Sequence, residues 1–131
     1  MPLEMPVKVA DASALAALLF GEIEGERVSA ALSSDILVAP GLLPYEIANT
    51  AVMKLRRGEI DIQTAEGSLP RLALMRVELR PVTMDMVLVL AHDTGLTAYD
   101  ASYLWLAREL DCQLVTLDKK LHAAAGPLAA P

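Results

Sequence analysis

The chain has 131 residues, of which 54% are hydrophobic and 4% aromatic, and its formal net charge is −6 at pH 7. This length suffices for one domain with one core, so we expect a single domain over residues 1–131. The acidic balance argues against a protein that binds nucleic acid through a generally basic surface. RNA binding would have to rest on a local basic patch, on bound cations or on an assembly.

No apolar run approaches the roughly 20 residues that cross a bilayer. The start, MPLEMPVKVAD, lacks the basic region and the long apolar stretch of a signal peptide. The single cysteine, Cys112, excludes an internal disulfide framework and suits a reducing compartment. Because no Cys or His cluster accompanies it, we interpret Cys112 as a core residue. These features predict a cytoplasmic protein without a membrane anchor.

The first elements follow from short local signals. The β-branched run at 7–10 predicts a strand, and Asp11 is placed to cap a helix over 12–20 that ends at Gly21. A second short helix is expected over 24–32.

Strands and helices are also expected to alternate through the middle of the chain. An apolar strand is expected at 36–39 and a long helix at 42–57. The pattern over 62–79 is helical, but Pro70 should split it into two pieces. A short strand at 80–83 would lie at an edge or crossover, because proline cannot complete a central ladder.

The last third of the chain predicts helices at 84–92, 96–110 and 119–125 and a strand at 113–116. The final residues, LAAP, should be loosely held. Methionines in the stretch MRVELRPVTMDMVL recur at helical spacing, which favours core positions over an interface. Alternating strands and helices predict an α/β fold, a three-layer α/β/α sandwich around a parallel sheet of four to five strands.

The helix at 96–110 organises the chain, because it has almost no solvent face. Thr97 is a good N-cap, and Asp100 stands where the acid of a capping box belongs. Asp100 shares a face with Tyr103, Leu104 and Ala107. A carboxylate at the mouth of an apolar face is costly unless it is paired, hydrogen-bonded or bound to a cation.

Four carboxylates are predicted to converge at one edge of the sheet. Asp11 and Asp118 follow the ends of strands, Glu46 lies in the first turns of a helix, and Asp100 opens another. In open α/β sheets, ligands bind outside the carboxyl ends of the strands. Each acid also has a plain structural explanation, since Asp11, Asp100 and Asp118 could be helix caps and Glu46 could be solvated. Asn49 and Thr50, which share its helix, extend the polar patch around Glu46.

Such a cluster needs protons or cations, because two carboxylates about 4 Å apart repel by about 4 kcal/mol at an effective dielectric near 20. His92 and His122 stand in no motif with the acids, and zinc prefers nitrogen and sulfur ligands. An all-oxygen site suits Mg²⁺ or Mn²⁺, which points to phosphoryl or phosphodiester chemistry.

Four segments together carry a family resemblance: VADASALAALLFGE, LLPYEIAN, GLTAYDASYLWLAREL and LVTLDKKL. In this order they resemble a PIN domain, and more narrowly the VapC-type toxins of prokaryotic toxin–antitoxin pairs. Asp11, Glu46, Asp100 and Asp118 match the family's acidic positions. Ser13 and Thr116 match polar positions that often support them.

The resemblance implies a Mg²⁺- or Mn²⁺-dependent endoribonuclease that dimerises and is inhibited by a cognate antitoxin. On this hypothesis Asp11, Asp100 and Asp118 hold the metal, directly or through waters. Glu46 completes the site or orients the attacking water, which makes a Ser or Cys nucleophile unnecessary. Whether one or two ions bind, and which RNA is cut, does not follow from the sequence.

Basic residues would have to hold the RNA backbone. Lys119 and Lys120, beside Asp118, are the better candidates by position. Two other groups are more simply explained as solvated surface, namely Lys54, Arg56 and Arg57 in one helix and Arg71, Arg76 and Arg80 further along.

Two other functions compete with the nuclease. A phosphatase or phospho-acceptor domain also places Asp at strand ends, but a phospho-acceptor would want paired acids after the first strand, and Asp11 stands between alanines. A non-catalytic interaction module of the same fold would not need all four acids.

Overall fold

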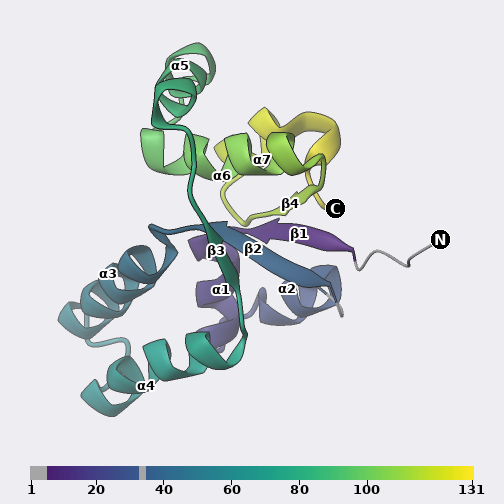
Figure 1. The fold of residues 1–131 in the computed structure, drawn as a ribbon. Helices are drawn as coiled ribbons and strands as arrows, with labels where there is room; N and C mark the ends of the chain where they lie inside the picture. The colour runs from purple at the N-terminus through teal and green to yellow at the C-terminus, as the bar shows by residue number, and fades with distance from the viewer. Residues whose placement is uncertain (1–5, 33–34) are drawn as a thin grey trace.

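The computed structural model describes residues 6–32 and 35–131. The first five residues, part of the stretch that was compared with a signal peptide, lie outside the described part. Four strands form one parallel sheet in the order β3-β2-β1-β4 (Figure 1). Their bounds are Val7–Ala10 (β1), Ile36–Pro40 (β2), Glu78–Arg80 (β3) and Gln113–Val115 (β4). The predicted parallel sheet of an α/β sandwich is confirmed.

Helices cover both faces of this sheet (Figure 1). On one face lie α1 (Ala12–Leu19), α2 (Gly25–Leu32), α3 (Leu43–Arg56) and α4 (Ile62–Leu74). On the other lie α5 (Met84–Thr94), α6 (Ala98–Leu110) and α7 (Lys119–Ala125), followed by the short 3₁₀ turn η1 (Gly126–Leu128). None of the helices in the described part is long and apolar enough to cross a membrane.

The helix α6 is central, as its sequence predicts. It packs on β1, β2 and β4, and six of its thirteen residues are buried, including Tyr103 and Leu104. Its two ends are more exposed than expected, at Ala98, Tyr99, Arg108 and Glu109. Thr97 caps it, accepting a hydrogen bond from the Asp100 amide at 3.1 Å. The buried face of α6 therefore fixes the position of its first turn, where Asp100 stands.

The segment that comprises α4, β3 and the turn between them differs from prediction in two ways. Pro70 does not split the helix, because Pro70 and Glu66, whose carbonyl loses its usual partner, are both exposed and water can bind that carbonyl. The helix also ends earlier than expected, at Leu74, since Arg76 adopts a left-handed conformation (φ 54°) that turns the chain. The strand accordingly begins at Glu78 and pairs in parallel with Val38–Pro40 of β2 at the sheet edge.

Two predictions about loose and buried segments were wrong. The tail is docked, because the Ala130 amide donates to the Leu114 carbonyl at 3.0 Å and Ala130 is buried. Met84 and Met86 are exposed on α5 rather than buried in the core. Cys112 is half-buried against the core, close to its predicted role.

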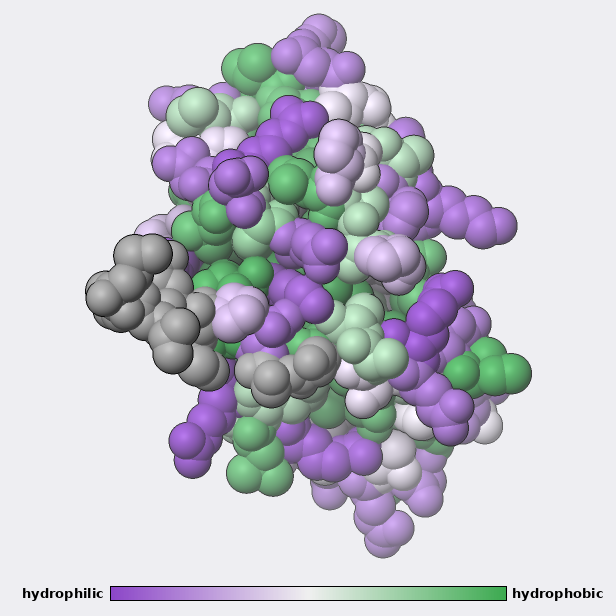
Figure 2. Space-filling view, turned by 90° about the vertical axis from the view of Figure 1, so that its right-hand side faces the viewer, coloured by the Kyte–Doolittle hydropathy of each residue, from purple (hydrophilic) through white to green (hydrophobic). Residues whose placement is uncertain are grey.

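The side of the molecule at which β1 begins has a mixed surface outside the residues drawn in grey. In Figure 2, hydrophilic and hydrophobic residues are interspersed over this side. The strands run away from it, so their carboxyl ends lie on the opposite side of the molecule (Figure 1).

Candidate active site

Asp11 lies at the end of β1, where the chain passes directly into α1. Its Oδ1 caps α1 by accepting from the Ala14 amide at 3.0 Å and from the Ser13 hydroxyl at 2.7 Å, while Oδ2 accepts from the Thr116 hydroxyl. The residue is only 4% exposed. Burial raises the pKa of this carboxyl above its usual range, although the three donors act in the opposite direction. The hydrogen bonds therefore immobilise Asp11, and its burial leaves the carboxylate charge poorly solvated.

Glu46 stands in the first turns of α3 and is held by a residue far away in the sequence. The Tyr103 hydroxyl, from α6, donates to Glu46 Oε1 at 2.7 Å. Burial raises the pKa of Glu46, the tyrosine hydrogen bond lowers it, and the charges of Asp100 and Asp11 raise it again. The same partnership raises the pKa of Tyr103 far above its usual value, with burial as the main cause. Tyr103 therefore stays protonated and acts as a hydrogen-bond donor to Glu46.

Asp100 and Asp118 complete the acidic group from the other layer. Burial is the main cause that raises the pKa of Asp100, followed by the charge of Asp118, while the Lys120 ammonium and a hydrogen bond with Thr97 oppose the increase. Asp118 caps α7, accepting from the Leu121 amide at 2.8 Å. Its own amide donates to the Thr116 hydroxyl at 3.0 Å, so Thr116 joins Asp11 and Asp118.

All four carboxylates line one cleft at the carboxyl edge of the sheet, with a volume of about 520 Å³. The remaining lining residues are Ala12, Ser13, Leu42, Tyr45, Asn49, Thr50, Tyr99 and Tyr103. No Lys, Arg or His belongs to this lining. The cleft is large enough for a nucleotide-sized ligand and carries negative charge only.

Comparison with known proteins identifies the family of the chain. A family model described as the PIN domain matches residues 8–127. The chain belongs to the PIN-domain family. It is 33% identical over 128 residues to "Ribonuclease VapC3" of Pyrobaculum aerophilum, which covers 94% of this chain and 98% of the relative.

Solved structures agree with this assignment of the fold. A crystal structure of PAE2754 from Pyrobaculum aerophilum superposes with a TM-score of 0.75 at 30% identity, covering 95% of this chain and 82% of that one. The structure of Mycobacterium tuberculosis VapC20, described as a sarcin-ricin loop cleaving toxin, gives a TM-score of 0.65 at 18% identity over 95% of this chain and 99% of that one. The family model and the relative named VapC3 confirm the resemblance to VapC-type PIN proteins, and the solved structures confirm the fold.

The donor atoms of the cleft in this PIN domain are of the kind that would suit a hard divalent cation. The charged lining atoms are carboxylate oxygens, the ligands that Mg²⁺ and Mn²⁺ prefer, and three of the four acids have raised pKa values that a nearby cation would lower. Among residues 6–32 and 35–131, however, no three His, Cys, Asp or Glu side chains stand close enough to hold one ion as placed. Binding therefore requires the side chains of Glu46, Asp100 and Asp118 to draw inward.

The two residues predicted to support the acids, Ser13 and Thr116, both contact Asp11. Ser13 and Thr116 both donate to Asp11, and the Ser13 hydroxyl also accepts from the Leu117 amide at 2.9 Å. Thr50 instead donates to the Glu46 carbonyl at 2.9 Å, which occupies its hydroxyl within α3. Ser13 and Thr116 thus link the ends of β1 and β4 through one carboxylate.

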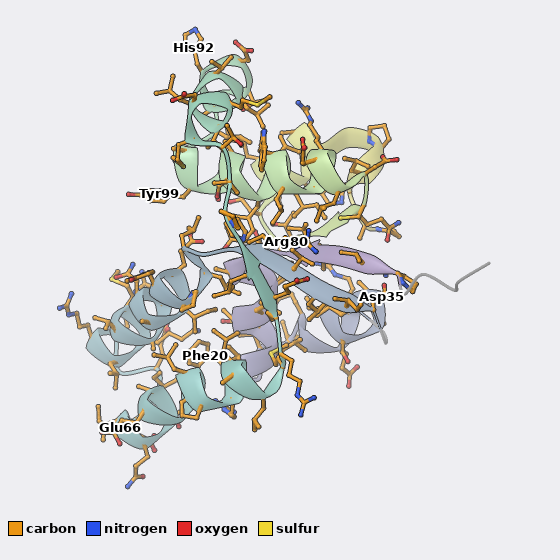
Figure 3. The ribbon with its side chains drawn as sticks, in the orientation of Figure 1. Phe20, Asp35, Glu66, Arg80, His92 and Tyr99 are labelled. Carbon is orange, nitrogen blue, oxygen red and sulfur yellow. The ribbon has the colours of Figure 1, made fainter. Side chains whose placement is uncertain are left out.

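None of the basic residues in the described part of the chain lines the cleft. The Lys120 ammonium donates to the Gly95 carbonyl at 2.6 Å and is close enough to lower the pKa of Asp100. Lys119 lines a second cavity together with Arg27 and His122. Lys54 is paired with Glu22 at 2.8 Å, which supports a structural role for it. His92 lies on α5, far from the cleft (Figure 3).

The sequence patterns gave none of the three tyrosines a role in the cleft. Tyr103 was recognised as sharing a face with Asp100, but its bond to Glu46 joins residues 57 positions apart. Tyr45 and Tyr99 each precede an acid of the cleft directly, and this adjacency was the only local signal.

Proposed function

We propose that this VapC-type PIN domain is a metal-dependent endoribonuclease that hydrolyses RNA phosphodiester bonds as the toxin of a type II toxin–antitoxin pair. The observation that carries the proposal is the cleft lined by Asp11, Glu46, Asp100 and Asp118 without a basic side chain. A ribonuclease name for the relative at 33% identity over nearly the whole chain supports the RNA substrate.

We assign Mg²⁺ or Mn²⁺ to the four carboxylates. When bound, such an ion supplies charge stabilisation on phosphate oxygens and favours deprotonation of water. The chain's own groups do the rest: Glu46, fixed by Tyr103, orients the attacking water and accepts its proton. Ser13 and Thr116 keep both oxygens of Asp11 in place, as hydrogen-bonding partners of a ligand do. Lys119 and Lys120 contact the RNA backbone beyond the cleft.

The metal requirement and the site are tested together with purified protein and total cellular RNA. Cleavage into discrete fragments is expected with Mg²⁺ or Mn²⁺ and not with EDTA. Asp118→Asn is expected to reduce cleavage at least tenfold, because it removes a carboxylate while asparagine still caps α7. Expression of the wild type should arrest bacterial growth, and expression of this variant should not.

Asp111→Asn is the matched control. Asp111 ends α6 in a left-handed conformation (φ 48°) that asparagine tolerates, and it does not line the cleft. Cleavage by this control should equal that of the wild type. Cleavage that persists in EDTA, or in Asp118→Asn, would refute the assignment. If the wild type itself showed neither cleavage nor calorimetric metal binding, a non-catalytic module would be favoured.

On the same resemblance we propose a cognate antitoxin as inhibitor and the cytoplasm as the place of action. We also propose a homodimer that forms through α5, whose Met84, Met86, Leu88 and Val89 are more than half exposed. Several exposed apolar side chains on one helix are typical of an interaction surface.

The dimer proposal predicts that Leu88→Glu yields monomers. A charge placed in an apolar interface is desolvated without a partner, whereas the exposed Leu88 contributes little to the folded monomer. Light scattering after gel filtration should give twice the chain mass for the wild type and for Leu74→Glu, a control at an exposed leucine on α4. A dimer that survives Leu88→Glu would place the interface elsewhere.

A further inference from the structure

All three tyrosines of the chain line the acidic cleft, although aromatic residues make up only 4% of the sequence. Tyr103 is buried, but Tyr45 is 79% and Tyr99 is 65% exposed. Tyr45 belongs to the first turn of α3 and Tyr99 to the first turn of α6, so the two rings come from opposite layers of the sandwich. Figure 3 shows Tyr99 extending outward from α6 on the side where α3 lies.

Neither exposed ring is explained by packing. A tyrosine stabilises a fold mainly through the area it buries, and these two leave most of their surface in water. The other aromatic residues behave differently, because Phe20 and Trp105 are partly buried against the core and Lys54 lies over the Phe20 ring. Large exposed aromatic rings are therefore concentrated at the cleft.

Each exposed tyrosine directly precedes an acid of the cleft, Tyr45 before Glu46 and Tyr99 before Asp100. Neighbouring residues on a helix point about 100° apart. When the acid faces the cleft floor, the ring before it is directed to the rim. The two rings are thus held beside the carboxylates, each by a helix whose position the core determines.

The charge of the cleft decides which part of a nucleic acid these rings can bind. The lining contains four carboxylates and no basic residue, so it offers the phosphate backbone no direct attraction. Stacking of a base on an aromatic ring does not depend on the sign of the charge around it. Affinity inside this cleft must then come from bases and from cations.

We propose that Tyr45 and Tyr99 stack the bases on the two sides of the scissile phosphate. The proposal rests on the proposed ribonuclease function. A base can stack on a side chain only after it has left its own helical stack, which excludes regular duplex RNA. Because every base has a π-face, the rings select for unpaired structure and not for base identity.

The test uses a short single-stranded RNA with 2-aminopurine beside the cut, and the same strand in a duplex. Binding is measured with Ca²⁺ in place of Mg²⁺, by the quenching of 2-aminopurine fluorescence that accompanies stacking. Cleavage is measured separately with Mg²⁺. Tyr45→Ala and Tyr99→Ala are each expected to weaken single-strand binding and raise KM about tenfold, with kcat nearly unchanged.

Replacing each tyrosine by phenylalanine or by leucine separates binding by ring stacking from binding to any apolar side chain. Tyr45→Phe and Tyr99→Phe should keep wild-type binding, whereas the leucine variants should resemble alanine. Leu74→Ala, at an exposed apolar side chain on α4 outside the cleft, is the control and should change nothing. Because both tyrosines are exposed, these variants are expected to fold.

The outcomes distinguish this proposal from the one on which it rests. Cleavage and binding unchanged in the alanine variants would overturn stacking and leave the ribonuclease standing, with the rings free for a protein partner. Equal cleavage of single strand and duplex would overturn it as well. Tyrosine-dependent quenching without any cleavage would refute the ribonuclease and support stacking.

Discussion

Asp100→Asn is expected to lower kcat/KM for RNA cleavage about a thousandfold, since a metal site supplies several kcal/mol of transition-state stabilisation and each 1.4 kcal/mol is tenfold. The same variant should be at least as stable as the wild type in EDTA. Asparagine keeps the size of the side chain, and the Thr97 cap is unaffected because its partner is the backbone amide of residue 100.

The expected stability follows from the direction of the pKa shift. Burial and Asp118 raise the pKa of Asp100, so the folded state binds a proton more readily than the unfolded chain does. The ionised carboxylate therefore costs stability, and this cost is fully present above the raised pKa and is lost as the pH falls from there toward the ordinary pKa of an aspartate. An amide carries no such charge.

Thermal unfolding at neutral pH checks this prediction with and without Mg²⁺. The wild type should gain Tm with Mg²⁺, because an ion that binds only the folded state stabilises it, and Asp100→Asn should gain much less. Asp93→Asn, an exposed acid at the end of α5, is the control and should behave as the wild type. A large loss of Tm in EDTA for Asp100→Asn would make Asp100 a structural residue.

The acids of the site were predictable because each has a local signal. Asp11 and Asp118 follow strands and cap helices, and in a parallel sheet all strand ends of one kind meet at one edge. Glu46 stands in the first turn of α3, which follows β2 and begins at this edge. Asp100 opens α6, which follows α5 and not a strand, so its place at the edge depends on the packing of α6 on the sheet. Their assignment as metal ligands remains a prediction.

What the sequence did not reveal depends on contacts between distant segments. The Tyr103–Glu46 hydrogen bond exists only because α6 and α3 meet across the sheet edge. Pro70 breaks helices by intrinsic preference, yet an exposed position lets water replace the lost bond. The tail is held by the free edge of β4, which becomes visible only when the strand order is known.

Tyr103→Phe is expected to lower kcat/KM about thirtyfold, since a hydrogen bond to a charged group contributes about 2 kcal/mol. The change removes only the hydroxyl that donates to Glu46 Oε1, and the ring keeps its buried position in the hydrophobic core. Tyr103 is a positioning residue, because its hydroxyl acts on Glu46 and not on the RNA. Without it, Glu46 can turn away from the attacking water.

The pH profile separates this role from a general loss of packing. The Tyr103 hydrogen bond lowers the pKa of Glu46, so its removal raises that pKa further. Because ionised Glu46 is the active form, the acid limb of kcat/KM against pH should move to higher pH in Tyr103→Phe. Tyr99→Phe, which leaves the Glu46 bond intact, should keep the wild-type profile. A uniform loss of activity at every pH would mean that the hydroxyl only supports the core, whereas a shifted limb ties the buried tyrosine to the protonation state of the carboxylate that the chemistry requires.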